Sequence, residues 1–258
     1  MAILDNIREG LNRGELFVEY LPTIVLADAR CAGAEALIRW RRGEVILAAR
    51  EFMPLVENTP LSGTLTYWVI DTVAAELGEW LGANPEARIG INVPAEILGR
   101  GGLEYAARRS GLQTRVEQIV LEITEHGVPD RLGLQALQFM AEHGVRVALD
   151  DVMLSGTNLA LLTRCNFSMI KLAAELVAEI RRGHPEPQWL ESLRALLRTS
   201  SLQVVAEGVE ADFQAQALRA AGVQLAQGYF YSTPLRSREM MDFYSARRGG
   251  RNATETKR

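Results

Sequence analysis

This 258-residue sequence has few cysteines and histidines and no excess of basic residues. Its two cysteines, Cys31 and Cys165, lie in apolar segments without the paired spacing of a metal or redox motif. We therefore expect buried thiols in a reducing compartment. The formal net charge is -4 at pH 7, whereas a general nucleic-acid-binding protein carries a basic surface, so no nucleic-acid polymer is expected as a partner.

Several kinds of segment are also missing. Asp5, Arg8 and Glu9 interrupt the N-terminal stretch, and no signal peptide or membrane span is visible, so we expect a cytoplasmic protein. No Gly-rich phosphate loop follows a strand-like segment, which disfavours nucleotide-binding open sheets. With 48% hydrophobic and 23% charged residues, the composition is globular. We predict one domain over residues 1–246 and a disordered polar tail over 247–258.

Strand-like and helix-like segments alternate along most of the chain. The first two strands, 16–26 and the one that begins near Cys31, are separated by too few residues for a parallel crossover, which predicts an antiparallel pair. With six further strands, the pattern predicts an α/β protein, a modified TIM (β/α)8 barrel with the first strand antiparallel; a doubly wound open sheet is the alternative. The further strand-like runs are 87–93, 118–125, 145–152, 168–172, 203–209 and 225–231, and the helix-like runs are 2–13, 50–57, 61–80, 103–110, 132–143, 157–163, 174–182, 187–200, 212–221 and 238–247.

The apolar segment 34–40 carries two charged side chains, Glu35 and Arg39. They are four residues apart, so in a strand both point to the same face, and buried charges need partners. Other strand-like runs also end in polar side chains, and in a barrel the carboxyl ends of the strands meet at one mouth. These polar residues are Asn92, Glu122, Glu125, Asp150, Asp151, Lys171 and Glu207.

One acidic residue at a strand end is more often a cap or a loop anchor than a functional group. Several carboxylates that converge with one lysine and one arginine repel each other unless their pKa values rise or cations neutralise them. Oxygen ligands of this kind suit Mg²⁺, Mn²⁺ or Ca²⁺. Zinc is less favoured because the three histidines, His126, His143 and His184, lie outside the set and are expected at the surface.

In order and in kind, these residues resemble the EAL-domain family of cyclic di-GMP phosphodiesterases. The resemblance covers roughly residues 12–245, and the joint occurrence of the motifs is specific. It independently implies a barrel with one antiparallel strand. The matching motifs are Glu35-Ala36-Leu37 followed by Arg39, then Asn92, Glu122-Ile123-Thr124-Glu125, Asp150-Asp151, Lys171, Ala206-Glu207-Gly208-Val209-Glu210 and Gln227-Gly228-Tyr229.

The resemblance implies a two-metal site and a water nucleophile. Lys171 resembles the lysine that holds or polarises the attacking water, and Glu207 resembles the general base or a partner of the metal-bound water. Glu35 is expected to act both in catalysis and as a ligand. The expected metal ligands are Glu35, Asn92, Glu122, Asp150 and, for the second ion or its water, Asp151.

The remaining implied roles concern substrate and loop. Arg39 resembles a substrate-phosphate contact, Gln227 lies in a stretch like the one lining a guanine pocket, and Glu125 resembles the residue that braces the loop after its strand. The implied reaction is hydrolysis of cyclic di-GMP to linear pGpG by metal-activated water, with Mg²⁺ or Mn²⁺ as cofactor and Ca²⁺ as an inhibitory substitute. A homodimer is expected by analogy.

Two alternative functions stay open. A non-catalytic cyclic di-GMP receptor would keep the pocket without turnover, and another metal hydrolase could use the same barrel. The sequence departs from the family pattern at Leu21, where glutamine is usual, and at Ala173, where aspartate is usual. The usual Phe-Gly-Thr-Gly is replaced by Val-Met-Leu-Ser at 152–155, which predicts a different loop path with Asp150 and Asp151 still able to reach the metals.

Overall fold

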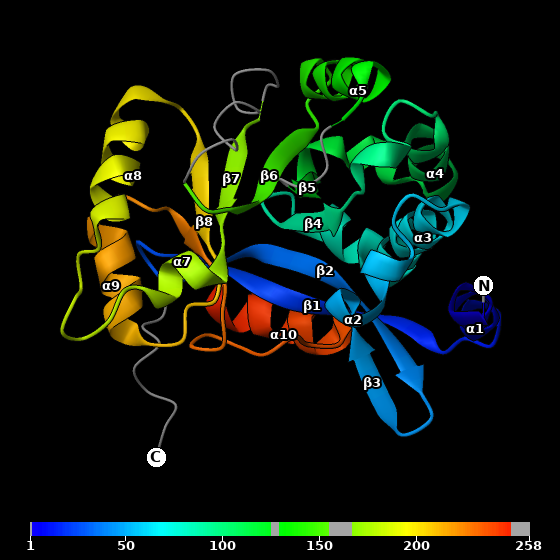
Figure 1. Cartoon of the computed structure of the whole chain (residues 1–258), viewed down its shortest axis with the longest axis horizontal. Helices are drawn as coiled ribbons and strands as arrows, with labels where there is room; N and C mark the ends of the chain where they lie inside the picture. The colour runs from blue at the N-terminus through cyan, green and yellow to red at the C-terminus, as the bar shows by residue number, and fades with distance from the viewer. Residues whose placement is uncertain (1, 125–128, 155–166, 249–258) are drawn as a thin grey trace.

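The computed structural model describes residues 2–124, 129–154 and 167–248 of the chain. Within them, nine strands form one sheet, and all but β3 close into a barrel (Figure 1). The strand order is β1-β9-β8-β7-β6-β5-β4-β2-β3, and β1 also pairs with β2. The strands are β1 (Leu16–Val25), β2 (Cys31–Arg42), β3 (Val45–Ala48), β4 (Arg88–Asn92), β5 (Ile119–Thr124), β6 (Arg146–Val152), β7 (Met169–Leu172), β8 (Gln203–Ala206) and β9 (Leu225–Ala226).

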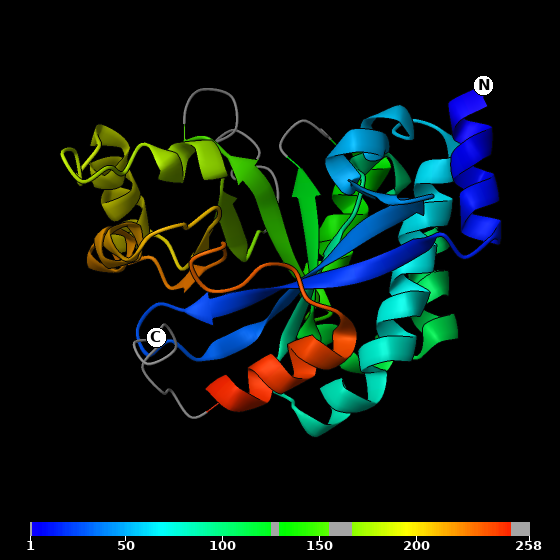
Figure 2. The same cartoon turned by 90° about the horizontal axis from the view of Figure 1, so that it is seen from below.

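Strand β1 closes the barrel as its one antiparallel member. It pairs antiparallel with β2 from Leu16 opposite Trp40 onward and antiparallel with β9 on its other edge, whereas β2, β4 and the later barrel strands run parallel. The prediction from the short first connection is therefore confirmed. Closure through β1 also excludes the open doubly wound sheet. Figure 2 shows β1 and β2 side by side, and Figure 1 shows the β2–β3 hairpin extending beyond the barrel.

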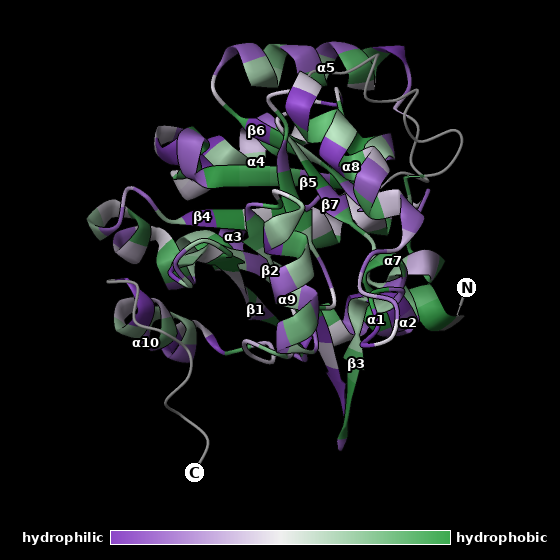
Figure 3. Ribbon diagram, turned by 90° about the vertical axis from the view of Figure 1, so that its left-hand side faces the viewer, coloured by the Kyte–Doolittle hydropathy of each residue, from purple (hydrophilic) through white to green (hydrophobic). Residues whose placement is uncertain are grey.

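Helices surround the barrel, and hydrophobic and hydrophilic residues alternate along them (Figure 3). Thr59 caps the longest helix, α3, by accepting a hydrogen bond from the backbone N–H of Leu61, and α10 packs against β1 and β2. No helix of the described residues combines the length and the apolar character needed to cross a membrane. The α-helices are α1 (Ala2–Asn12), α2 (Ala49–Phe52), α3 (Pro60–Ala83), α4 (Gly102–Ser110), α5 (Arg131–Glu142), α7 (Ala174–Ala178), α8 (Gln188–Thr199), α9 (Asp212–Ala220) and α10 (Ser237–Arg247), and 3-10 helices cover Met53–Leu55, Ala95–Ile97 and Leu112–Gln118.

Several boundaries differ from the sequence prediction. Strand β3 was not predicted, and β8 and β9 are much shorter than the expected runs 203–209 and 225–231. Strand β9 ends at Ala226, and beyond it the Gly228 backbone, at φ 149°, lies against Val209: a Cβ at Gly228 would be 2.2 Å from the Val209 carbonyl oxygen. The expected helix 157–163, Glu125, His126, Cys165 and the tail from 249 lie outside the described residues.

The barrel interior is layered, and the layers position the polar side chains. An apolar layer lines the middle of the barrel. Because side chains alternate along each strand, the next inward position toward the carboxyl end places Glu122 above Val120 and Lys171 above Met169. The apolar layer consists of Val120, Ala148, Met169, Val205 and Leu225.

Candidate active site

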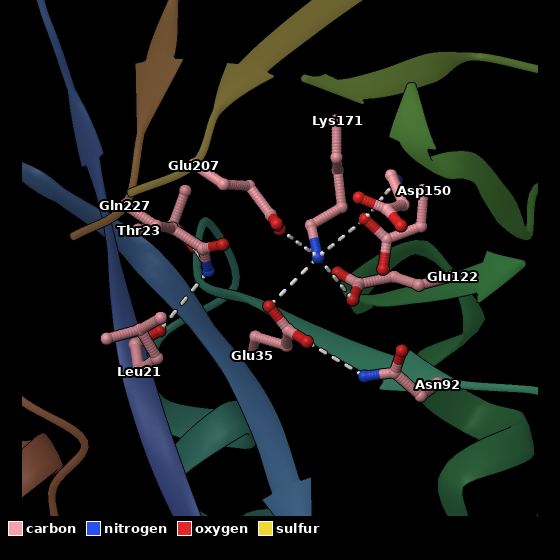
Figure 4. A network of polar contacts seen from close by, with 10 residues as sticks. Leu21, Thr23, Glu35, Asn92, Glu122, Asp150, Lys171, Glu207 and Gln227 are labelled. Carbon is pink, nitrogen blue, oxygen red and sulfur yellow. Dashed lines mark hydrogen bonds and ion pairs between the residues drawn. The ribbon is translucent and has the colours of Figure 1, made fainter. Parts of the chain in front are cut away.

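Lys171 lies at the centre of the mouth, and four carboxylates surround its ammonium group (Figure 4). Lys171 Nζ donates to Glu35 Oε2 and Glu122 Oε2, each at 2.9 Å. It also lies 2.6 Å from Glu207 Oε1 and 3.3 Å from Asp150 Oδ1. The lysine side chain is 1% exposed, so these charges interact away from bulk water. The structure thus brings together residues from β2, β5, β6 and β7 and the residue after β8.

The register of β4 and β5 makes room for Glu122. Asn92 is opposite Glu122, and Gly90 lies one inward position below. A Cβ at Gly90 would be 2.0 Å from Glu122 Oε1, so only glycine lets this carboxylate lie in the barrel. The Asn92 side chain donates from Nδ2 to Glu35 Oε1 at 2.8 Å and thereby orients the second carboxylate oxygen of Glu35 toward Lys171.

Burial and mutual repulsion perturb the pKa values of the group. Burial raises the pKa of Glu122 well above its usual range, and Glu35 raises it further. Burial likewise raises the pKa of Glu207 to about 8, with Lys171 offsetting part of the shift. Burial opposes ionisation of Glu35, but Lys171 and Asn92 more than offset this and lower its pKa. Burial opposes the charge of Lys171, yet the surrounding carboxylates hold its pKa well above the usual value, so the lysine is an ammonium ion.

The donor set fits a divalent cation. Glu35, Glu122 and Asp150 are buried and place carboxylate oxygens within 4.8 Å of one another. Oxygen ligands at this spacing suit Mg²⁺ or Mn²⁺. Four carboxyl groups share one ammonium group, and a divalent ion would favour their ionised form by supplying further positive charge. The residues present therefore fit the expected metal.

Asp151 does not belong to the group of three carboxylates that lie within 4.8 Å of one another. Its backbone N–H donates to Asp150 Oδ1 at 2.8 Å, and its own backbone is left-handed, with φ 61°. The pairing of β6 with β7 is irregular at this point, between Leu149 and Val152. Leu154 is also left-handed, with φ 52°, a conformation that costs a non-glycine residue roughly 1 kcal/mol or more. The loop after β6 therefore begins in an unfavourable backbone conformation, and its continuation at 155–158 lies outside the described residues.

Arg39 forms an ion pair at the rim of the mouth. Its Nε donates to Glu19 Oε2 on β1 at 2.8 Å, and its Nη1 donates to the Ile38 carbonyl. Sequence reasoning did not single out Glu19. Glu19 is two residues from Leu21 on β1, so both side chains face the same side of the sheet, and Leu21 is opposite Glu35. The sequence does not indicate which residues of β1 and β2 are opposite each other, so this pair could not be predicted.

Gln227 lies across the mouth from Asn92 (Figure 4). Its Nε2 donates to Thr23 Oγ1 at 2.9 Å and to the Leu21 carbonyl at 3.4 Å. Its Oε1 is buried and has no hydrogen-bond partner among the described residues. A buried acceptor of this kind suits an N–H or O–H donor from a ligand or from water. Thr23 is a further positioning residue that the sequence did not indicate.

Comparison with known proteins decides the family. A family model described as EAL domain matches residues 4–234. The chain belongs to the EAL-domain family. A relative in Pseudomonas aeruginosa, named bifunctional diguanylate cyclase/cyclic di-GMP phosphodiesterase MucR, is 27% identical over 247 residues, which cover 93% of this chain and 36% of that protein. The probable cyclic di-GMP phosphodiesterase PdeB of Escherichia coli is 29% identical over 233 residues, covering 89% and 44% of the two chains. The chain thus spans less than half the length of these relatives.

Solved EAL structures share the barrel. The MucR phosphodiesterase domain in complex with c-di-GMP superposes with a TM-score of 0.82 at 27% identity, covering 93% of this chain and 100% of that one. The EAL enzyme Bd1971 in its cAMP-bound form has a TM-score of 0.85 at 22% identity, covering 94% and 70%, and supports the fold alone. The predicted family and the TIM-like barrel with its antiparallel first strand are confirmed.

Proposed function

We propose that this chain is a metal-dependent phosphodiesterase that hydrolyses cyclic di-GMP to linear pGpG. The observation that carries the proposal is the buried excess of carboxylates around Lys171. A divalent ion would hold these carboxyl groups in their ionised form, and its charge would allow an acidic mouth to accept an anionic substrate. Relatives at 27–29% identity that are named cyclic di-GMP phosphodiesterases give the substrate class.

Glu35, Asn92, Glu122 and Asp150 would hold one ion, and Asp151 would serve a second ion or its water. When bound, the ion would polarise the phosphodiester and lower the pKa of a water molecule. Lys171 is an ammonium ion and has no lone pair, so it acts as a hydrogen-bond donor that positions an oxygen atom of the water or the phosphate. The carboxylate of Glu207 is the group that could accept the proton from the attacking water, because it lies 2.6 Å from the Lys171 ammonium group that would position this water.

Two groups beside the carboxylates suit the substrate. Arg39 at the rim is the expected phosphate contact, since a guanidinium forms charge-assisted hydrogen bonds with phosphate oxygens. Gln227 Oε1 is a buried acceptor that suits an N–H of the guanine base. Thr23 would keep the Gln227 amide oriented by accepting from its Nε2.

Turnover tests the proposal. The protein is incubated with cyclic di-GMP and Mg²⁺ or Mn²⁺, and the products are separated by chromatography, with EDTA and a Glu122→Gln variant as controls. The expected result is linear pGpG with either metal and none in the two controls. Absence of product over hours with the substrate intact would overturn the enzymatic proposal.

A cyclic di-GMP receptor without turnover is the second candidate function. Two observations favour this candidate. Asp151 does not belong to the group of three close carboxylates, and the backbone at Leu154 is left-handed; both disfavour the binding of a second ion. Metal-independent binding of cyclic di-GMP without product identifies the receptor. If cyclic di-GMP does not bind at all, the barrel serves another phosphate substrate.

A further inference from the structure

The rim of the mouth carries one ion pair, formed by Glu19 and Arg39. Their contact is short, 2.8 Å from Arg39 Nε to Glu19 Oε2, and the two side chains are 23% and 12% exposed. On β2, Arg39 has the same strand parity as Glu35 and lies four residues further toward the carboxyl end, which is about 13 Å along a strand. On β1, Phe17 is opposite Arg39 and Glu19 is opposite Leu37. The pair therefore lies above the carboxylates, where a substrate would enter.

The charge of Arg39 is largely offset by this contact. Its Nε is taken by Glu19 and its Nη1 by the Ile38 carbonyl, so part of the guanidinium is already occupied. At the rim, the Glu19 carboxylate offsets the positive charge of Arg39, and at the centre the surrounding carboxyl groups offset that of Lys171. Without a metal ion, the mouth therefore offers a phosphodiester anion no net positive charge.

Two further arginines near the rim do not replace Arg39. The Arg41 guanidinium lies 5.3 Å from the centre of the Phe17 ring, and that of Arg236 lies 4.4 Å from it. Both stack on this aromatic ring, and Arg41 lies further along β2 from Glu35 than Arg39 does. Arg39 is therefore the arginine of β2 that lies nearest to Glu35, and it is already paired with Glu19.

We propose that Glu19 is a specificity-determining counter-ion that makes capture of the phosphodiester anion depend on the metal. In the metal-free protein Glu19 holds Arg39 and adds a repulsive charge, so cyclic di-GMP binds weakly. A divalent ion among the central carboxylates removes the repulsion, and the phosphate then shares Arg39 with Glu19. This inference rests on the proposed function, because it takes cyclic di-GMP as the ligand.

The test compares the wild-type protein with Glu19→Gln, which removes the charge but keeps an oxygen acceptor for Arg39. Cyclic di-GMP binding is measured by calorimetry in EDTA, and KM and kcat are measured with saturating Mg²⁺. In EDTA, Glu19→Gln is expected to bind about tenfold more tightly, the effect of one nearby charge. With Mg²⁺, the expected change is a decrease of KM within about threefold and little change of kcat.

Two controls separate this role from a structural one. Glu186→Gln removes the same charge from a pair with Arg194 that contains none of the mouth residues, and should leave binding unchanged. In an Arg39→Met background, Glu19→Gln should lose most of its effect, because the two residues act as a pair. Far-UV circular dichroism and the melting temperature check that each variant is folded.

Equal or weaker binding by Glu19→Gln in EDTA would overturn the inference, since Glu19 would then be neutral or would help to position Arg39. A tenfold effect that persists in the Arg39→Met background would also overturn it. If neither protein binds cyclic di-GMP with or without Mg²⁺, the proposed function fails, and the inference fails with it. Binding by the wild type that is equally tight with and without metal contradicts the inference alone.

Discussion

The mouth of the barrel contains two cations in contact with carboxylates, and their settings differ. At the centre, Lys171 is 1% exposed and has four carboxylate partners. At the rim, Arg39 is 12% exposed and has one, Glu19. The central cluster has more carboxyl groups than its one ammonium group can pair, which favours a metal ion, whereas the rim pair is neutral. The comparison shows that an ion pair alone does not make a metal site. What a charged site can bind depends on how many carboxyl groups surround the cation and on how deeply they are buried.

Replacing each cation by methionine is the strongest way to break this comparison. Lys171→Met leaves four buried carboxylates without an ammonium group and is expected to lower the free energy of unfolding in EDTA by roughly 3–5 kcal/mol. Arg39→Met should cost clearly less, because Glu19 is 23% exposed and water can solvate its charge. Urea denaturation of both variants, with and without Mn²⁺, measures the difference. Equal losses for the two variants would show that the centre and the rim are energetically alike.

Glu207→Gln sharpens the comparison within the central cluster. The variant keeps the shape of the side chain but removes the group expected to accept the proton from water. The expected result is a kcat lower by about 10²–10⁴ with KM nearly unchanged. A loss confined to KM would instead place Glu207 in substrate binding.

The pH dependence of stability is the smallest expected effect. Glu207 has a pKa of about 8 in the fold, against a usual value of 4.5, so the folded metal-free protein binds a proton more readily than the unfolded chain does. This contribution therefore stabilises the fold at low pH and is lost as the pH rises from about 4.5 through about 8. Urea denaturation in EDTA at pH 6, 7 and 8.5 should give a shallower decline for Glu207→Gln than for the wild type. Parallel declines would remove Glu207 as the cause.

Much of the fold could be predicted from local sequence. The short connection between the first two strands required an antiparallel pair, and alternation of strands and helices indicated the barrel. The boundaries of β8 and β9 could not be predicted, because the segments after these strands pack against each other, as Gly228 does against Val209, and local sequence does not indicate such a contact. Strand β3 was missed because its residues Val45 and Ile46 are exposed and belong to a hairpin outside the core.

The candidate site was predicted as a set of residues but not as a geometry. Polar residues at strand ends indicated convergence, and the structure places Glu35, Asn92, Glu122, Lys171 and Glu207 together. The sequence could not indicate that Lys171 contacts four carboxylates at once or that Glu19 pairs with Arg39, because both depend on inter-strand register. The roles assigned to these residues remain predictions, as does that of Asp151.

The most direct test of the central claim follows Lys171 while metal is added. The chain contains two lysines, Lys171 and Lys257, so ¹⁵N-lysine labelling gives a side-chain spectrum with only two ammonium resonances. If the carboxylates around Lys171 bind a divalent ion, titration with Mg²⁺ should shift one resonance saturably, at concentrations that support hydrolysis, and Glu122→Gln should abolish the shift. A Lys171 resonance that stays unchanged at Mg²⁺ concentrations giving full activity would contradict the account.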